Sequence, residues 1–297
     1  MVVKKTGTMN IVQIYKQFPD HTSCIKHLEI IRWKNIPECP YCHSKNATPV
    51  PKELRYHCNN CNTSFSVTVG TVFHKTKLDL QQWFLAVSLV LNAKKGISAR
   101  QLARDINVTK DTAWYMMMRL RKALVEYGEL LEGIIEADET YVGGKNKNRH
   151  SDKKTVGGQG RGGEDKTPVI GLLERGGKVR ARKAKDVSGK TLKSFIKQNV
   201  KEGSQVMTDE WKSYNGLSLL YGHSIINHSM GEYVNGCVHT NTLEGFWSLL
   251  KRGVIGQYHY VTPKYLNKYV DEFCFRYNNR KNVAIFDLTI QKAVNIN

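Results

Sequence analysis

Residues 131–141 read Leu-Glu-Gly-Ile-Ile-Glu-Ala-Asp-Glu-Thr-Tyr, and they mark the change from helices to strands in the second half of the chain. Its composition favours a β-strand. The strand carries Asp138 near its end. The neighbouring strands therefore determine which groups this carboxylate faces.

The elements after this strand alternate between strands and helices. Residues 167–174 and 178–185 predict a hairpin, and Ser188 is suited to cap a helix that ends near residue 200. Further predictions are a strand at 205–209, a helix at 213–220, a strand at 223–227, and helices at 242–252 and 265–280. Three strands, helix, strand, helix, strand, helix is the order of a ribonuclease-H-like α/β domain with a mixed sheet. The Gly- and Lys-rich residues 143–166 predict a basic loop.

Acidic residues stand where this fold brings strand ends together. Asp138 ends the first strand, Asp209 ends the fourth, and Glu244 lies at the start of a later helix. Such a trio can hold two divalent cations about 4 Å apart for phosphodiester chemistry. Hard carboxylate ligands suit Mg²⁺ or Mn²⁺.

Four other polar residues compete for these roles. Glu136 shares a strand face with Asp138, while Glu139 lies on the opposite face, so either acid could instead be solvated or salt-bridged. Glu210 follows Asp209 directly, and Asn241 lies one helical turn before Glu244. The residues alone leave these alternatives open.

Two CxxC pairs near the N-terminus predict a zinc site. The pairs are Cys39 with Cys42 and Cys58 with Cys61, and fifteen residues separate them. Four thiolates complete a tetrahedral shell with no position left for water, which predicts a structural Zn²⁺. Short strands at 47–50, 54–57 and 64–69 would make a zinc ribbon. His43 and His57 adjoin ligand cysteines and are alternative ligands.

The segment after the ribbon is helical. Apolar residues recur at helical spacing over 78–91, and two further helices are predicted at 98–106 and 109–124. Their lengths and the short turn between them are typical of a DNA-binding helix-turn-helix, although an ordinary helical hairpin has the same pattern. The predicted DNA-binding residues here are Lys110, Thr112, Tyr115, Arg119, Arg121 and Lys122.

Composition supports a nucleic-acid partner. The 297 residues contain 45 Lys and Arg against 26 Asp and Glu, and 45 − 26 gives a net charge of +19. Basic side chains that neutralise phosphates release counterions, so this charge favours a polyanion. The longest strongly apolar run, residues 83–91, is too short to span a bilayer, and no secretory signal follows the first lysines. We therefore expect no membrane association and a cytoplasmic, nucleoid-associated protein.

Three blocks of sequence carry a resemblance to a known family. They are residues 136–145 (EADETYVGGK), 209–214 (DEWKSY) and 239–252 (HTNTLEGFWSLLKR). Thirty-four residues separate Asp209 from Glu244, and Lys251 follows Glu244 by seven. In this pattern, and in the ribbon before it, the chain resembles the zinc-ribbon group of bacterial insertion-sequence DDE transposases, the IS fifteen-ninety-five family.

The resemblance implies an activity and a set of roles. Asp138, Asp209 and Glu244 would bind Mg²⁺ or Mn²⁺, Lys251 would complete the catalytic set, and Arg252 would hold DNA phosphate. The expected reaction is metal-dependent cleavage at the terminal inverted repeats, then strand transfer of the 3′-hydroxyl into double-stranded target DNA. The family also implies a homodimer or higher oligomer.

The sequence thus predicts three domains: an N-terminal helix and zinc ribbon at 1–76, a helix-turn-helix region at 77–128, and the catalytic domain at 129–297. Two other functions fit parts of the pattern. A DNA-binding regulator could share the ribbon and the helix-turn-helix, but it gains nothing from clustered carboxylates. A nuclease could share the catalytic fold and lack strand transfer.

Overall fold

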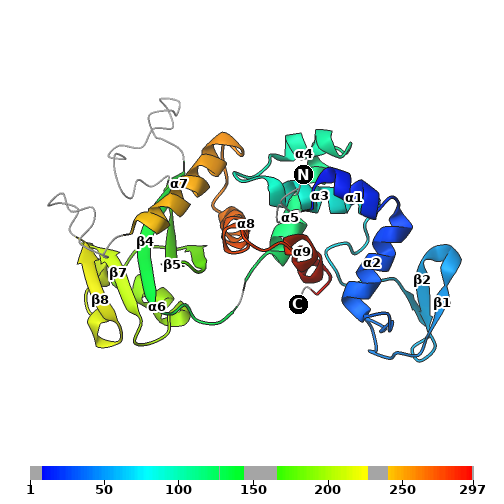
Figure 1. Cartoon of the computed structure of the whole chain (residues 1–297), viewed down its shortest axis with the longest axis horizontal. Helices are drawn as coiled ribbons and strands as arrows, with labels where there is room; N and C mark the ends of the chain where they lie inside the picture. Colours follow the sequence, from blue (N-terminus) through cyan, green and yellow to red (C-terminus); the bar gives the residue numbers. More distant parts are fainter. Residues whose placement is uncertain (1–8, 127, 144–165, 227–239, 296–297) are drawn as a thin grey trace, which may run out of the picture. The chain divides into compact units, whose positions relative to one another are not determined.

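The computed structural model describes residues 9–126, 128–143, 166–226 and 240–295 (Figure 1). The chain forms two compact units, residues 1–125 with 279–297 and residues 126–278. This division differs from the three predicted domains, because ribbon and helix-turn-helix share one unit and the C-terminal residues join them. Apart from its end residues 143 and 166, the predicted basic loop lies outside the described residues.

The first unit begins with two helices and the ribbon. Its elements here are α1 (Ile11–Gln17), α2 (His21–Trp33), β1 (Ala47–Val50), the 3-10 turn η1 (Pro51–Glu53), β2 (Arg55–Cys58) and β3 (Thr63–Phe65). The three strands form an antiparallel sheet in the order β1-β2-β3. Asp20 begins α2 with a capping box, since its side chain accepts from the Ser23 N–H and its own N–H donates to the Ser23 hydroxyl.

Four more helices complete this unit: α3 (Leu80–Asn92), α4 (Ala99–Asp105), α5 (Lys110–Ala123) and α9 (Ile285–Val294). Ser98 and Thr109 cap α4 and α5, since each side chain accepts a hydrogen bond from a backbone N–H of the first turn. Asn107 turns the chain between these two helices with a left-handed φ of 53°. Helix α9 contacts α2, α3 and α5, so the end of the chain is part of this core.

The second unit is built on one mixed sheet. Its strands are β4 (Ile134–Gly143), β5 (Lys166–Glu174), β6 (Val179–Lys183), β7 (Gln205–Asp209) and β8 (Gly222–Ile226). The sheet order is β6-β5-β4-β7-β8, with β4, β5 and β6 antiparallel and β7 and β8 parallel to β4. Its helices are α6 (Gly189–Asn199), α7 (Asn241–Gly256) and α8 (Leu266–Asn278). The ribonuclease-H-like arrangement predicted from the element order is confirmed.

The alternation of β4 separates the two faces of this sheet. Ile135 and Ala137 join a buried apolar core with Phe195 and Ile196 of α6. Glu136 and Asp138 alternate with these residues and point to the other face, where α7 crosses β4 and β5 (Figure 1). Residues 136 and 138 therefore face α7.

One predicted helix is wrong. Residues 213–220 form two 3-10 turns, η4 (Lys212–Tyr214) and η5 (Leu217–Leu219). Gly216 adopts a φ of +85° between them, which interrupts helical hydrogen bonding.

Among the described residues, no helix is both long and apolar enough to cross a membrane.

Candidate active site

The register of β4 and β7 brings two aspartates to one place. Their last paired residues are Glu136 and Met207, and Asp138 and Asp209 lie two residues further along each strand (136 + 2 and 207 + 2). Parallel strands lie about 4.8 Å apart, so Asp138 in the middle of β4 lies beside Asp209 at the end of β7, although the sequence predicted Asp138 at a strand end.

A third carboxylate joins them. Oxygen atoms of Asp138, Glu139 and Asp209 all lie within 4.8 Å of one another. Burial raises the pKa of Asp138 to about 7, and the neighbouring charges of Glu139 and Asp209 act in the same direction. Crowded carboxylates that hold a proton near neutral pH are suited to a divalent cation, because the cation would neutralise the same repulsion. The residues present therefore fit Mg²⁺ or Mn²⁺.

Neighbouring groups orient two of these acids. The Trp211 backbone N–H donates to Oδ1 of Asp209 at 3.1 Å. The Tyr214 hydroxyl donates to Oε2 of Glu139 at 3.0 Å. Burial raises the pKa of Tyr214 well above its ordinary value, and Glu139 adds to that shift, so Tyr214 stays a proton donor.

Glu136 has a different role from Asp138 although both face α7. Its carboxylate is fully buried and accepts from Arg175 Nε, from the Thr242 hydroxyl and from the Leu243 N–H, each at 2.9 Å. The negative charge thus lies at the N-terminus of α7, where the helix dipole favours it. Glu136 anchors the helix and is not available to a cation.

Helix α7 lines a cleft of about 980 Å³ that also contains the three clustered acids. Glu244, Lys251 and Arg252 of α7 lie on its wall, while Asn241 is not among its described lining residues. The Glu244 carboxylate accepts from the Thr240 hydroxyl at 3.3 Å, and it is not part of the 4.8 Å cluster. One cleft therefore presents both acidic and basic groups.

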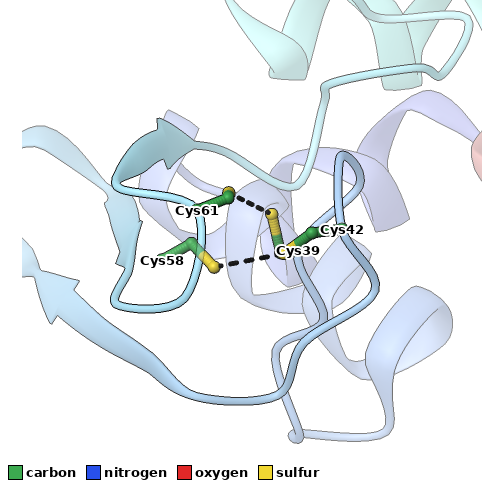
Figure 2. Close-up of side chains that lie close together, drawn as sticks. All are labelled: Cys39, Cys42, Cys58 and Cys61. Atoms are coloured by element: carbon green, nitrogen blue, oxygen red, sulfur yellow. Dashed lines mark hydrogen bonds between the residues drawn. The ribbon is translucent and has the colours of Figure 1, made fainter.

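The four predicted zinc ligands converge. The Sγ atoms of Cys39 and Cys61 lie 3.7 Å apart, and those of Cys42 and Cys58 lie 3.5 Å apart (Figure 2). Tetrahedral zinc with Zn–S bonds of roughly 2.3 Å places its sulfurs about 3.8 Å apart, so this donor set fits Zn²⁺. The Cys61 backbone N–H lowers the pKa of the Cys58 thiol to about 6, and the Asn60 N–H adds to this, which favours a thiolate.

The two histidines beside the cysteines lie outside this cluster. His43 contacts Glu38 at 3.0 Å and is 79% exposed, and His57 contacts Asn62 at 3.0 Å. The described cluster consists of the four thiols.

The predicted DNA-binding residues of α5 divide into two groups. Lys110, Tyr115 and Lys122 are exposed, and the Thr112 hydroxyl contacts that of the capping Thr109.

Arg119 and Arg121 contribute to the packing of the first unit. Arg119 donates to the carbonyls of Thr71 and His74, which fastens the loop before α3. Arg121 is only 1% exposed, so its predicted contact with phosphate does not agree with the structure. The helical periodicity could have placed Arg121 on the face shared with the buried Met117.

The structure decides the position of one residue whose role the sequence left open, and it adds one that the sequence did not single out. For Glu139 the sequence leaves a metal ligand and a solvated or salt-bridged acid as alternatives, and the structure places it in the cluster. Trp247 carries no predicted role in the site, and its buried indole N–H donates to Oδ2 of Asp138 at 3.0 Å. Both contacts join distant segments, which a strand or helix pattern does not encode.

The mixed sheet and its acidic cluster place the second unit in the ribonuclease-H-like class. The model of the ISXO2-like transposase domain matches residues 130–278, and that of the transposase zinc-ribbon domain matches residues 19–64. The chain therefore belongs to the ISXO2-like transposase family and is a transposase of an insertion element, as the three sequence blocks predicted.

A relative in Halobacterium salinarum supports this membership. It is described as an uncharacterized protein in transposable element ISH50 and is 32% identical over 249 residues, or 80% of this chain and 84% of the relative. Among solved structures, the Mos1 strand transfer complex matches with 13% identity and a TM-score of 0.29, covering 71% of this chain and 74% of that one. A pre-cleavage Mos1 transpososome matches with 12% identity and a TM-score of 0.28, covering 70% and 75%.

Proposed function

We propose that this transposase cleaves phosphodiester bonds at the ends of its element and transfers the 3′-hydroxyl into target DNA. The observation that carries the proposal is the cluster of Asp138, Glu139 and Asp209, whose oxygens approach within 4.8 Å in a cleft that also holds basic residues. When bound, Mg²⁺ or Mn²⁺ would activate the attacking oxygen and stabilise the leaving one. We propose Asp138 and Asp209 as its ligands.

The third ligand has two candidates. We propose Glu244, because it lies on the cleft wall and its helix also carries Lys251. Glu139 is the alternative, because the cluster already includes it. Comparing the Mn²⁺ affinities of Glu244→Gln and Glu139→Gln distinguishes them, since loss of a ligand weakens binding more than loss of a nearby charge.

The basic side of the cleft would hold the DNA. Lys251 and Arg252 are exposed and line the cleft. Lys166, the first residue of β5, lines it as well. Cationic side chains on the cleft wall beside the acidic cluster would bind phosphates on either side of the scissile bond. We propose that Arg252 holds DNA phosphate and that Lys251, besides contacting phosphate, completes the catalytic set that the family pattern implies.

The first unit would recognise the ends of the element. Exposed residues on α5 (Lys110, Tyr115 and Lys122) support double-stranded DNA as its partner, with Thr112 near the start of the helix. We leave Arg119 and Arg121 out of the DNA-contacting set. Zn²⁺ would hold the ribbon beside this helix-turn-helix, and a homodimer or higher oligomer on bacterial nucleoid DNA would pair two element ends.

Cleavage of labelled end DNA tests the reaction. Wild-type protein with Mg²⁺ should nick at the element end and join that end to a target duplex. Asp209→Asn should bind the DNA with unchanged affinity and give no product, because it removes a cation-binding charge at constant size. Cleavage without joining would identify a nuclease, and equal cleavage by the variant would refute the assignment of Asp209.

A further inference from the structure

Trp247 occupies an unusual place beside the acidic cluster. Its ring is buried against the sheet, with 4% of the residue exposed, and its N–H donates to Oδ2 of Asp138 at 3.0 Å. It lies on α7 three residues after Glu244, and Phe246 packs beside it with ring centroids 5.3 Å apart. A helix that carries cleft residues is thus hydrogen-bonded directly to the first aspartate.

The sheet makes room for this ring at one position. Gly171 of β5 pairs with Asp138 of β4. A Cβ atom at residue 171 would lie 2.5 Å from Cη2 and 2.6 Å from Cζ2 of Trp247. Any larger residue would therefore have to displace the indole. The glycine, the tryptophan and the aspartate form one packing unit across two strands and a helix.

A second contact fixes the same helix one turn earlier. Buried Glu136 accepts from the Thr242 hydroxyl and the Leu243 N–H at the start of α7. Glu136 and Asp138 are two residues apart on β4, so the strand holds the helix through successive side chains on one face. The Glu136 contact sets where α7 begins, and the Trp247 contact sets how close the helix lies to Asp138.

We propose that Trp247 is a positioning residue for the metal site. This inference rests on the proposed function, in which Asp138 binds the divalent cation. The indole N–H holds Oδ2 and so restrains the plane of the carboxylate that would bind the cation. Groups that orient a ligand in this way typically contribute 10–100-fold to metal affinity. The same hydrogen bond couples the depth of α7, and with it Glu244 and Lys251, to the liganding aspartate.

The hydrogen bond can be observed without metal. The full-length zinc-loaded protein has five tryptophans, and their indole N–H resonances can be assigned by single Trp→Phe variants. Asp138→Asn should shift the Trp247 resonance most, because a charged acceptor is replaced by a neutral amide. An unchanged Trp247 resonance would overturn the proposed contact.

Metal affinity tests the positioning role itself. Replacing Trp247 by 3-benzothienylalanine keeps the two-ring shape but exchanges the N–H for sulfur, so the packing survives without the donor. We expect the Kd for Mn²⁺, measured by titration of the full-length protein, to rise roughly tenfold. Gly171→Ala should produce a comparable loss by displacing the ring. Trp114→Phe removes an indole in the first unit, from a residue that is 37% exposed, and should leave Mn²⁺ affinity unchanged.

The variants separate this inference from the proposed function. If Asp138→Asn abolishes Mn²⁺ binding and 3-benzothienylalanine at position 247 weakens it, the metal assignment and the role of Trp247 are both supported. Binding that is lost in Asp138→Asn and unchanged in the isostere overturns the role of Trp247 alone. Binding that Asp138→Asn leaves intact overturns the metal assignment and this inference with it.

Discussion

Glu136 and Asp138 carry the same functional group on one face of β4, but their positions give the two carboxylates different roles. Glu136 is sealed beneath α7, where Arg175 and the start of the helix satisfy its charge. Asp138, two residues further on, lies beyond the last paired residue of β7 and opens into the cleft. The sequence placed both on one face but could not distinguish anchor from ligand, because the groups that hydrogen-bond their side chains lie between 39 and 109 positions away.

Asp271 on α8 gives a residue-scale prediction for pH. Burial raises its pKa from 3.8 to about 7, although Asn267 donates a hydrogen bond that acts in the opposite direction. The folded protein then binds this proton more tightly than the unfolded chain does. Stability from this group is therefore greatest below about pH 4, and it falls as pH rises to about 7.

Asp271→Asn should remove that fall. We expect the variant to gain more stability over wild type at pH 8 than at pH 5, with a difference of roughly 1–2 kcal/mol. Urea unfolding at both pH values measures it. A gain of equal size at pH 5 and pH 8 would contradict the raised pKa.

At the scale of elements, local signals were sufficient wherever local contacts decide the structure. Ser98, Thr109 and Ser188 each cap a helix by accepting a hydrogen bond from a backbone N–H three residues ahead, and Ser188 was predicted as such a cap from the sequence. Strand β7 has the predicted bounds. Helix α9 was not predicted, because a ten-residue apolar segment near the end of a chain does not reveal which core it joins.

The ribbon depends on zinc at the same scale. Trp33 at the end of α2 packs edge-on against Tyr56 and Phe65, with ring centroids 5.6 and 5.7 Å apart, so the metal-held strands and the helix share a small core. Removing Zn²⁺ should unfold β1 to β3, because metal binding supplies on the order of 10 kcal/mol in zinc-finger peptides. Hydrogen exchange should show loss of protection over residues 47–65, whereas the protection of β4 to β8 should be unchanged.

Matched cysteine variants provide the control. Cys39→Ser should lower the zinc content below one ion per chain and reproduce the exchange pattern. Cys24→Ser changes a buried thiol outside the cluster and should retain one zinc. Retention of a full zinc equivalent by Cys39→Ser would contradict the four-thiolate site.

At the scale of the molecule, the chain leaves the first unit near residue 125 and returns to it at 279. The match to the catalytic family ends at residue 278, at the same boundary. We expected residues 129–297 to be one domain, since an unbroken run of strands and helices gives no sign of a return. The last helix instead packs with α2, α3 and α5 in the first unit.

This path predicts that a residue near the C-terminus stabilises the N-terminal unit. The Phe286 ring lies 6.2 Å from that of Phe18 and 5.7 Å from that of Phe84, measured between centroids. Phe286→Ala should destabilise this unit by about 3–4 kcal/mol through lost burial and the cavity left behind. Hydrogen exchange should accelerate in α2 and α3 and stay unchanged in the sheet of the second unit.

Val283 offers a control on the same segment. It is 71% exposed, so Val283→Ala should change stability by less than about 0.5 kcal/mol. Equal effects of the two substitutions, or loss of protection in β4 to β8, would contradict the assignment of α9 to the first unit.

A transposition assay measures whether this protein moves its element by means of the Asp209 carboxylate. A donor plasmid carries the gene with its flanking DNA, and insertions into a recipient are scored for wild type and for Asp209→Asn. We predict insertions flanked by short target duplications from the wild type and none from the variant, with equal protein levels. Insertions at equal frequency from Asp209→Asn would contradict a strand-transfer site built on the carboxylates of β4 and β7.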